Sequence, residues 1–439
     1  MSDDSNELSS PPAGRIAAFH YRDFRLYWTG LFLSNIGTWM QITAVSWLIY
    51  RMTRSPLQLG MNGLFRAVPA ICLGVISGTI ADRYDRRKLM LATQCLLGML
   101  ALLLGVLDHS ENIQLWQIYG ITFASAAVAS ADGPARQALF PALVPESVLP
   151  NAVALNSILM KGPALIGPLL AGIVISLIGT HGAFYANAGS YLCVVVALLL
   201  MRTPTPAPAP AIKSEFTHDL RSGLKYVYSQ NIILGIIAME ATSSVFGMDN
   251  AMLTIFASDV LRVGAHGFGM MQTARGIGAV VGSSLFIGGG QRPFQGRILL
   301  VASIVYGICF ALFGLSNSYS LSLILLAGVG ASDAIWAAAR STILQWTTPN
   351  VMRGRVMGVF QIATQGLNPL GQVETGVVVP LIGAREATFF GGSIVLLITL
   401  VTTFRIREIP RFKLSSAKGN LADVTASRTV SRRPDELGL

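Results

Sequence analysis

Five ionisable side chains lie inside long apolar runs of the sequence, where a charge is costly to keep. Three are cations, Arg66, Lys161 and Arg275, and two are acids, Glu240 and Asp333. Charged groups in such surroundings pair with one another or mark a pathway for ligands and protons. A guanidinium group binds a carboxylate or phosphate through two parallel hydrogen bonds. These residue types therefore predict a site where the cations hold an anion and an acid exchanges a proton.

An alternative interpretation is that these cations and acids only neutralise one another as internal ion pairs. The number of cations favours binding of an organic anion, because a site for cationic compounds presents acids and aromatic rings instead. The apolar run at 24–49 contains no acid in its middle, and its polar stretch includes Trp39 and Gln41. We count both residues as candidate substrate contacts. The sequence leaves both interpretations open.

The composition excludes a soluble fold for the segments that carry these residues. Of the 439 residues, 52% are hydrophobic and only 12% are charged, which is about half the charged fraction of a soluble domain. So few charges cannot cover the surface of a soluble core of this size. The net charge of +10 is spread over short loops and tails, so we expect no nucleic-acid partner. The remaining class is an all-α membrane protein, because a backbone in lipid must satisfy its own hydrogen bonds.

Runs of about 17–25 apolar residues predict membrane-spanning helices. Twelve such runs lie at 24–49, 57–81, 88–107, 114–137, 149–178, 182–201, 231–258, 266–288, 297–315, 319–345, 354–380 and 387–404. With the N-terminus inside, 25 Lys and Arg residues fall on the cytoplasmic side and 4 on the opposite side. The positive-inside rule therefore places both termini in the cytoplasm.

A Pro-rich segment, TPTPAPAPAI, divides the chain into two pseudo-symmetric six-helix halves. We predict a cytoplasmic tail at 1–23, one half at 24–201, a linker with an amphipathic helix at 202–230, the second half at 231–404 and a basic cytoplasmic tail at 405–439. An internal repeat supports this division, since Arg136 and Arg340 each precede a proline by nine residues. Two parallel halves around a central path would place Arg66 and Arg275 in equivalent helices that face each other.

A small-residue motif follows the proline in each half. GPLLAG contains Gly167, Pro168 and Gly172, and NPLGQ occupies 368–372 in the second half. Small residues allow membrane helices to approach closely. We therefore assign Gly167, Pro168 and Gly172 to helix packing.

The loop GTIADRYDRRK at 78–88 resembles the signature loop of the major facilitator superfamily. Its residues Gly78, Asp82, Arg83, Arg86 and Arg87 have separate physical roles. Glycine permits close helix approach, an aspartate pairs with a cation or caps a helix, and the arginines face anionic headgroups. An ordinary basic loop explains the arginines but neither the glycine nor the aspartate.

Longer stretches resemble one branch of that superfamily, the branch that holds the enterobactin and macrolide exporters. These are PARQALFPALVPESVLPNAVALNS at 134–157, RGRVMGVF at 353–360 and WMQITAVSWLIYRMTRSPLQLG at 39–60. The resemblance implies a proton-coupled secondary exporter that works by alternating access. It also implies a cytoplasmic gate in which the 78–88 loop contacts the opposite half near Arg353 and Arg355.

The resemblance and the three cations together favour export of a small anionic, siderophore-like metabolite. The alternative is a multidrug or macrolide efflux pump for neutral or cationic drugs. A non-transporting sensor is less favoured, because the 35-residue tail at 405–439 is too short for a signalling domain.

Signals of enzyme chemistry are absent from the sequence. It contains no GxxxxGK[ST] loop, no HExxH and no GxSxG, and its five histidines lie in predicted loops, tails or span ends. We expect no catalytic activity, no cofactor and no metal. The expected partners are the substrate, protons and the lipid bilayer, for a monomer in a bacterial inner membrane.

Overall fold

The structure, a computed structural model, describes residues 17–202, 216–288 and 293–412. The described residues form helices joined by short turns, and no strand occurs among them. The chain forms two compact units. Unit 1 comprises Met1–Ile212 and Val263–Thr273, and unit 2 comprises Lys213–Arg262 and Ala274–Leu439.

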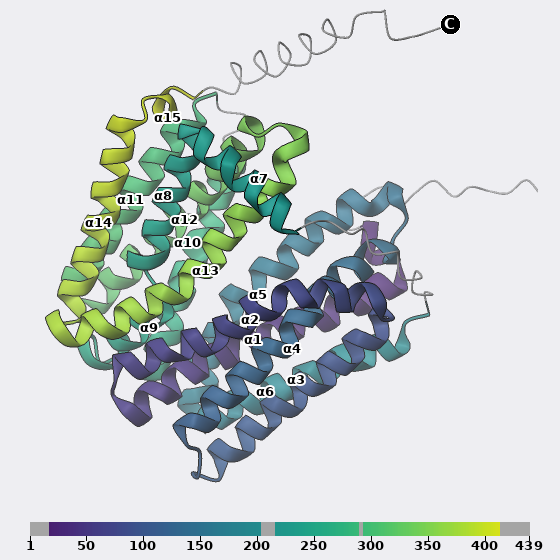
Figure 1. The fold of residues 1–439 in the computed structure, drawn as a ribbon. Coiled ribbons are helices and arrows are strands. Elements are labelled where there is room, and N and C mark those ends of the chain that lie inside the picture. Colours follow the sequence, from purple (N-terminus) through teal and green to yellow (C-terminus); the bar gives the residue numbers. More distant parts are fainter. Residues whose placement is uncertain (1–16, 203–215, 289–292, 413–439) are drawn as a thin grey trace, which may run out of the picture. The chain divides into compact units, whose positions relative to one another are not determined.

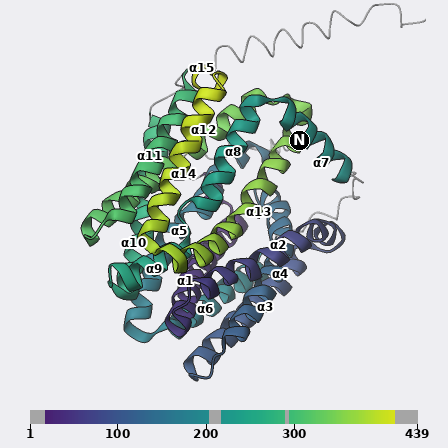
Figure 2. The ribbon, with the colours of Figure 1, turned by 60° about the vertical axis from the view of Figure 1, so that its left-hand side comes forward.

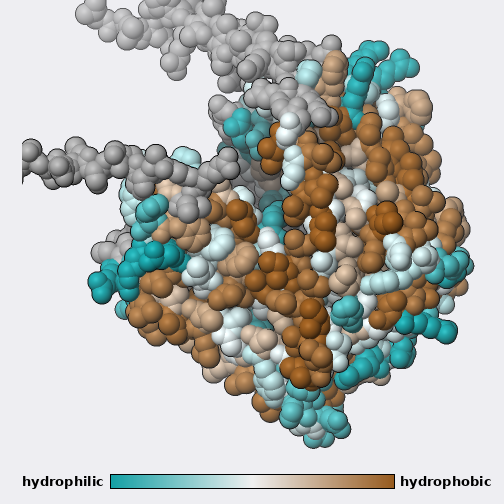
Figure 3. Space-filling view, turned by 180° about the vertical axis from the view of Figure 1, so that it is seen from behind, coloured by the Kyte–Doolittle hydropathy of each residue, from teal (hydrophilic) through white to brown (hydrophobic). Residues whose placement is uncertain are grey.

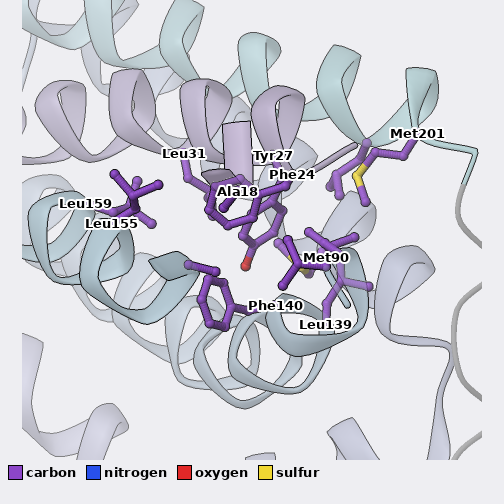
Figure 4. Packing of buried hydrophobic residues seen from close by; sticks show 14 of the residues in the cluster. Ala18, Phe24, Tyr27, Leu31, Met90, Leu139, Phe140, Leu155, Leu159 and Met201 are labelled. Atoms are coloured by element: carbon purple, nitrogen blue, oxygen red, sulfur yellow. The ribbon is translucent and has the colours of Figure 1, made fainter. Parts of the chain in front are cut away.

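The long helices of unit 1 form a bundle (Figures 1 and 2). They are α1 (Arg22–Thr53), α2 (Pro56–Arg83), α3 (Arg86–His109), α4 (Leu115–Leu139), α5 (Leu149–Ile178) and α6 (Thr180–Leu200). Helix α1 packs on α5 and α6, and α3 packs on α4 and α6. The buried cluster at one end of this unit contains Phe24, Tyr27 and Leu31 of α1 together with Met90 of α3 (Figure 4). Burial of one face of α1 therefore holds α3 and α5 in place.

The helices of unit 2 form a second bundle, in which α11 packs on α12 and α14, and α8 packs on α13 and α14. They are α7 (Phe216–Ser229), α8 (Asn231–Phe246), α9 (Asn250–Ile255), α10 (Gly264–Gly288), α11 (Gln295–Leu315), α12 (Tyr319–Thr347), α13 (Asn350–Ile382), α14 (Ala384–Arg405) and α15 (Glu408–Arg411). Helix α10 begins in the short segment assigned to unit 1 and continues into unit 2. Helix α7 packs on α13 at Gly223, where an added Cβ would lie 2.9 Å from the carbonyl oxygen of Arg355.

One predicted span differs from the structure, because the run at 231–258 is not a single helix. Helix α8 ends at Phe246, and α9 begins only at Asn250, followed by a π-helical turn at Phe256–Val260. Asp249 caps α9 by accepting a hydrogen bond from the backbone N–H of Met252 at 2.7 Å. The N–H of Met248 donates to the Tyr306 hydroxyl at 2.9 Å. The side chains of Asp249 and Tyr306 thus accept from backbone N–H groups that would donate to backbone carbonyls in a continuous helix. Hydropathy does not reveal this break, because the residues around it remain part of one apolar run.

Seven helical segments in the described part of the chain are long and apolar enough to cross a membrane, and one of them contains the break between α8 and α9. They are Arg86–His109, Glu146–Ile178, Thr180–Leu200, Asn231–Val260, Gln295–Leu315, Tyr319–Thr347 and Ala384–Arg405. Large apolar side chains cover much of the face shown in Figure 3, and Leu177, Ile287 and Phe404 are each more than three-quarters exposed. Such surfaces require lipid rather than water around them. The protein is therefore a multi-pass integral membrane protein.

Helices α1, α2, α4, α10 and α13 are also long, between 25 and 33 residues, but they do not combine length with the same apolar composition. Polar side chains explain the difference. Gln41, Arg66, Asp132, Arg275 and Glu374 lie on these five helices. Candidate functional groups therefore lie on these five helices as well as on the more apolar ones, which carry Lys161, Glu240 and Asp333.

Candidate functional site

An ion pair joins α10 to α12 in unit 2. The Nη2 atom of Arg275 lies 4.0 Å from the Oδ2 atom of Asp333, and their side chains are 30% and 45% exposed. The contact is long and both groups remain accessible, so the pair is weak. The structure therefore brings together two of the five predicted ionisable residues, in one of the pairings considered from the sequence.

Close packing of glycines brings α10 and α12 together at this pair. A Cβ added to Gly278 would collide with the carbonyl oxygen of Ala327, and one added to Gly330 would collide with the carbonyl oxygen of Arg275. A Cβ added to Gly282 would likewise collide with the carbonyl oxygen of Ala331. Small residues at a helix crossing let the two backbones touch. Side chains at 275 and 333 thus emerge from adjacent turns of two helices in contact.

A second ion pair in unit 2 connects α8 to α12. Glu240 pairs with Arg340, and their side chains are only 10% and 15% exposed. The guanidinium carbon of Arg340 also lies 4.5 Å from the ring centroid of Trp336 and 4.6 Å from that of Phe360. Cations over aromatic faces gain further electrostatic stabilisation. Glu240 is therefore held tightly, in contrast to Asp333.

The 25 cations assigned to the cytoplasmic side from the sequence include Arg340, which was not predicted as the partner of Glu240. A signal was available in the spacing along α12, because Trp336 and Arg340 follow Asp333 by three and seven residues. This spacing puts all three on one face of α12. An aspartate, a tryptophan and an arginine on one face of an otherwise apolar helix indicate a polar stripe.

Unit 1 contains a buried polar network that the sequence also failed to reveal. The Nη2 atom of Arg136 lies 2.5 Å from the Oδ2 atom of Asp132. Thr93 and the side-chain amide of Gln94 both donate to Oδ1 of Asp132, at 2.8 and 3.0 Å. The Nη1 atom of Arg136 donates to Asn35 of α1 at 3.4 Å. Asp132 thus accepts from three donors while it is only 3% exposed, which makes it a structural ion.

The other two predicted cations, Arg66 on α2 and Lys161 on α5, are exposed side chains. Among the residues that the structure describes, neither makes a hydrogen bond or an ion pair. Asn62 lies one turn before Arg66 on α2, and its Oδ1 atom is buried with no hydrogen-bond partner in the described part. Arg66 and Asn62 therefore offer polar groups on one face of α2. Asn62 was not predicted from the sequence.

The predicted contacts on α1 are held by neighbouring helices of unit 1. Gln41 accepts a hydrogen bond from the side-chain amide of Asn187 on α6 at 2.6 Å. Gly167 on α5 lies directly against Trp39, because an added Cβ would be 2.5 Å from the Trp39 Cβ atom. Pro168 and Gly172 are buried in the same helix. Gly167 therefore sets the approach of α5 to α1 at Trp39.

The predicted gate residues lie only in part within the described side chains. Those of Gly78, Asp82 and Arg83 lie outside them. Arg86 donates to the carbonyl oxygen of Ala138 at 3.2 Å, and Arg87 donates to that of Leu199 at 3.3 Å. Each arginine thus binds the carboxyl end of a helix in unit 1, where a cation is favourable.

Arg353 and Arg355, at the start of α13, were predicted to receive the gate loop. Arg353 donates to the carbonyl oxygen of Gln345 at 3.2 Å. The Nη1 atom of Arg355 lies 3.8 Å from the sulfur of Met352. Both contacts are local to unit 2.

Comparison with known proteins agrees with this architecture. Residues 13–429 match the transmembrane secretion effector family. The MFS-type transporter YfiS of Bacillus subtilis is 25% identical over 400 residues, covering 88% of this chain and 94% of the relative. The enterobactin exporter EntS of Shigella dysenteriae shows the same identity and coverage.

Solved structures show the same fold. A mutant of the nucleoside transporter NupG superposes with a TM-score of 0.71 at 14% identity, covering 88% of this chain and all of that one. A POT family transporter bound to a thioalcohol-conjugated peptide gives a TM-score of 0.69 at 14% identity, covering 88% of this chain and 96% of its own. The chain belongs to the transmembrane secretion effector family of MFS-type transporters, and it is a membrane transporter rather than an enzyme.

Proposed function

We propose that the protein is a proton-coupled secondary exporter of a small organic anion. It would work by alternating access between two six-helix halves, 24–201 and 231–404, with both termini in the cytoplasm of a bacterial cell and the protein acting as a monomer in the inner membrane. The observation that carries the proposal is the contrast between the two acids of unit 2. Asp333 is 45% exposed and only loosely paired, whereas Glu240 is 10% exposed and paired with a stacked arginine.

This contrast assigns different roles to the two acids. We infer that Asp333 exchanges the proton and that Glu240 is a structural ion. A substrate anion would compete with Asp333 for the guanidinium of Arg275. Proton-driven export requires that the substrate and the proton cross the membrane on opposite steps of the transport cycle. Asp333 would therefore carry its proton inward on the step in which Arg275 holds no substrate.

The substrate class follows from the cations. Arg66, Lys161 and Arg275 would bind carboxylate or phenolate groups, with Trp39 and Gln41 of α1 as further contacts. A relative of this chain is an enterobactin exporter, which supports a siderophore-like metabolite. A multidrug or macrolide efflux pump for neutral or cationic compounds is the alternative.

Transport into proteoliposomes tests the proposal. We expect inside-out vesicles with the purified protein to accumulate enterobactin when their interior is acidic, and to stop when a protonophore removes the gradient. Asp333→Asn should abolish the response to the gradient, whereas the control Glu146→Gln, at an exposed site outside these helices, should retain it. Flux that ignores the proton gradient would refute the coupling. Export of macrolides but not of enterobactin would favour the alternative substrate class.

A further inference from the structure

Two histidines that are far apart in the sequence meet at one end of unit 1. His109 is the last residue of α3, and His181 is the second residue of α6. Their ring centroids are 4.7 Å apart, with the ring planes at 84°. The ring of Tyr185, one turn further along α6, lies 6.1 Å from each of them. None of these residues takes part in the transport site described above.

The helices that carry the two histidines are tightly packed. A Cβ added to Gly105 of α3 would lie 2.8 Å from the ring of Tyr185, and one added to Gly98 would lie 3.3 Å from Tyr191. These close approaches fix α3 against α6 over several turns. Asp108 adds a further link, because its carboxylate accepts a hydrogen bond from the hydroxyl of Thr180. The two imidazoles therefore emerge from a rigid frame.

The ring nitrogens of this pair are available to a ligand. His181 folds over Gly179, where an added Cβ would lie 3.1 Å from Nδ1 but 4.0 Å from Nε2. Its Nε2 atom thus lies farther from Gly179 than Nδ1 does. His109 is exposed, so its ring is free to turn about its side-chain bonds. The buried carboxylate of Asp108, next to His109, contributes negative charge.

We propose that His109 and His181 together bind a divalent transition-metal ion such as Cu²⁺ or Zn²⁺. Imidazole nitrogen is a preferred ligand for both ions, and copper binds more tightly than zinc at such sites. Two imidazoles on one zinc ion, with bonds of about 2.0–2.1 Å, place their ring centres about 5 Å apart. The observed separation of 4.7 Å is close to this value, and a turn of the exposed His109 ring out of its edge-to-face contact would bring one nitrogen of each imidazole onto the same ion. Water molecules complete the coordination shell.

Metal binding at this position connects the end of α3 to the start of α6. An ion that binds the folded protein and not the unfolded chain stabilises the fold. Binding requires neutral imidazoles, so protons and the metal ion compete for the ring nitrogens. The ligand is a metal ion rather than the transported compound, and this proposal is independent of the proposed export function.

The test uses the full-length protein in detergent, purified with an affinity tag that contains no histidine. We expect Cu²⁺ to give an electron paramagnetic resonance spectrum with hyperfine coupling to two nitrogens at pH 7.5. The spectrum of His109→Asn should show at most one nitrogen. ZnCl₂ should raise the unfolding temperature of the wild type, and EDTA should reverse the rise.

Matched variants separate this site from other histidines. His266→Asn and His20→Asn should keep the two-nitrogen spectrum and the zinc-dependent rise, whereas His109→Asn should lose both. Because His109 is exposed, this variant is expected to fold even if His181→Asn does not. A wild-type spectrum with fewer than two nitrogens, or an unchanged zinc response in His109→Asn, would show that the pair is only an aromatic contact and overturn the proposal.

Discussion

Arg340 of α12 pairs with Glu240 of α8, and Arg136 of α4 makes a corresponding contact with Asn35 of α1. Both arginines lie in the same position of the proposed repeat, nine residues before a proline. Each therefore ties one helix to the first long helix of its own unit.

The two arginines are neutralised in different ways. Arg136 pairs with Asp132 in the same helix, whereas four residues before Arg340 the chain has Trp336, over which the guanidinium stacks. The charge of Arg340 is instead balanced across helices by Glu240. Of these two arginines, only Arg340 therefore links its helix to another through an ion pair.

The first prediction concerns the buried pair in unit 2. Arg340→Gln leaves the carboxylate of Glu240 buried without a cation, and we expect a loss of about 3–5 kcal/mol in the free energy of unfolding. Chemical denaturation in detergent, followed by circular dichroism, measures this loss. The double variant Glu240→Gln with Arg340→Gln should lose less than Arg340→Gln alone. A larger loss in the double variant would contradict the pairing.

The second prediction concerns the exposed pair. Arg275→Gln should weaken substrate binding by about 1.5–3 kcal/mol, because it removes a hydrogen bond to a charged group, while stability changes by less than about 1 kcal/mol. Arg275→Lys should recover only part of the affinity, since the ammonium group lacks the fork geometry. Binding is measured from the substrate dependence of transport in proteoliposomes. Normal transport by Arg275→Gln and Arg66→Gln would make both arginines structural.

The third prediction concerns the glycine crossing between α10 and α12. Gly278→Ala places a methyl group against the carbonyl oxygen of Ala327, so the helices must separate, at a cost of about 1–3 kcal/mol. Transport should fall as well, because Arg275 and Asp333 move apart. Gly120→Ala is the matched control, since an added Cβ there meets no atom within 4 Å. Thermal unfolding and transport assays should separate the two variants, and equal behaviour would show that the crossing tolerates a larger side chain.

The fourth prediction concerns the loop signature at 78–88. Asp82→Asn should lower transport and change the labelling of cysteine probes on the cytoplasmic side, while the amount of protein in the membrane stays the same. The reason is that the proposed gate depends on the charge of Asp82 beside a cluster of arginines. Lys88→Gln, which removes a cation of the same loop but leaves Asp82, provides the comparison. Unchanged transport by Asp82→Asn would argue against a gate at this loop.

The sequence predicted the helical membrane class and the family, because apolar runs and motif residues are local properties. It also identified Arg275, Asp333 and Glu240 as ionisable groups in apolar surroundings. It could not identify their partners, since a pairing such as Glu240 with Arg340 spans 100 residues. The role of Arg340 was not apparent from the sequence, because a cation near the cytoplasmic end of a span satisfies the positive-inside rule whether its side chain faces the cytoplasm or pairs with an acid on a neighbouring helix.

The interruption between α8 and α9 has a consequence for local unfolding. Successive turns of a continuous helix form and unfold cooperatively. Around Gly247–Asp249, however, the N–H of Met248 donates to the Tyr306 hydroxyl and the N–H of Met252 donates to the Asp249 carboxylate. We therefore expect α8 and α9 to unfold locally and independently of each other, so that the protection of their amides from exchange depends on the helices each one packs against. Amide hydrogen exchange should therefore show different exchange rates before and after residues 247–249, although the hydropathy profile shows a single span there.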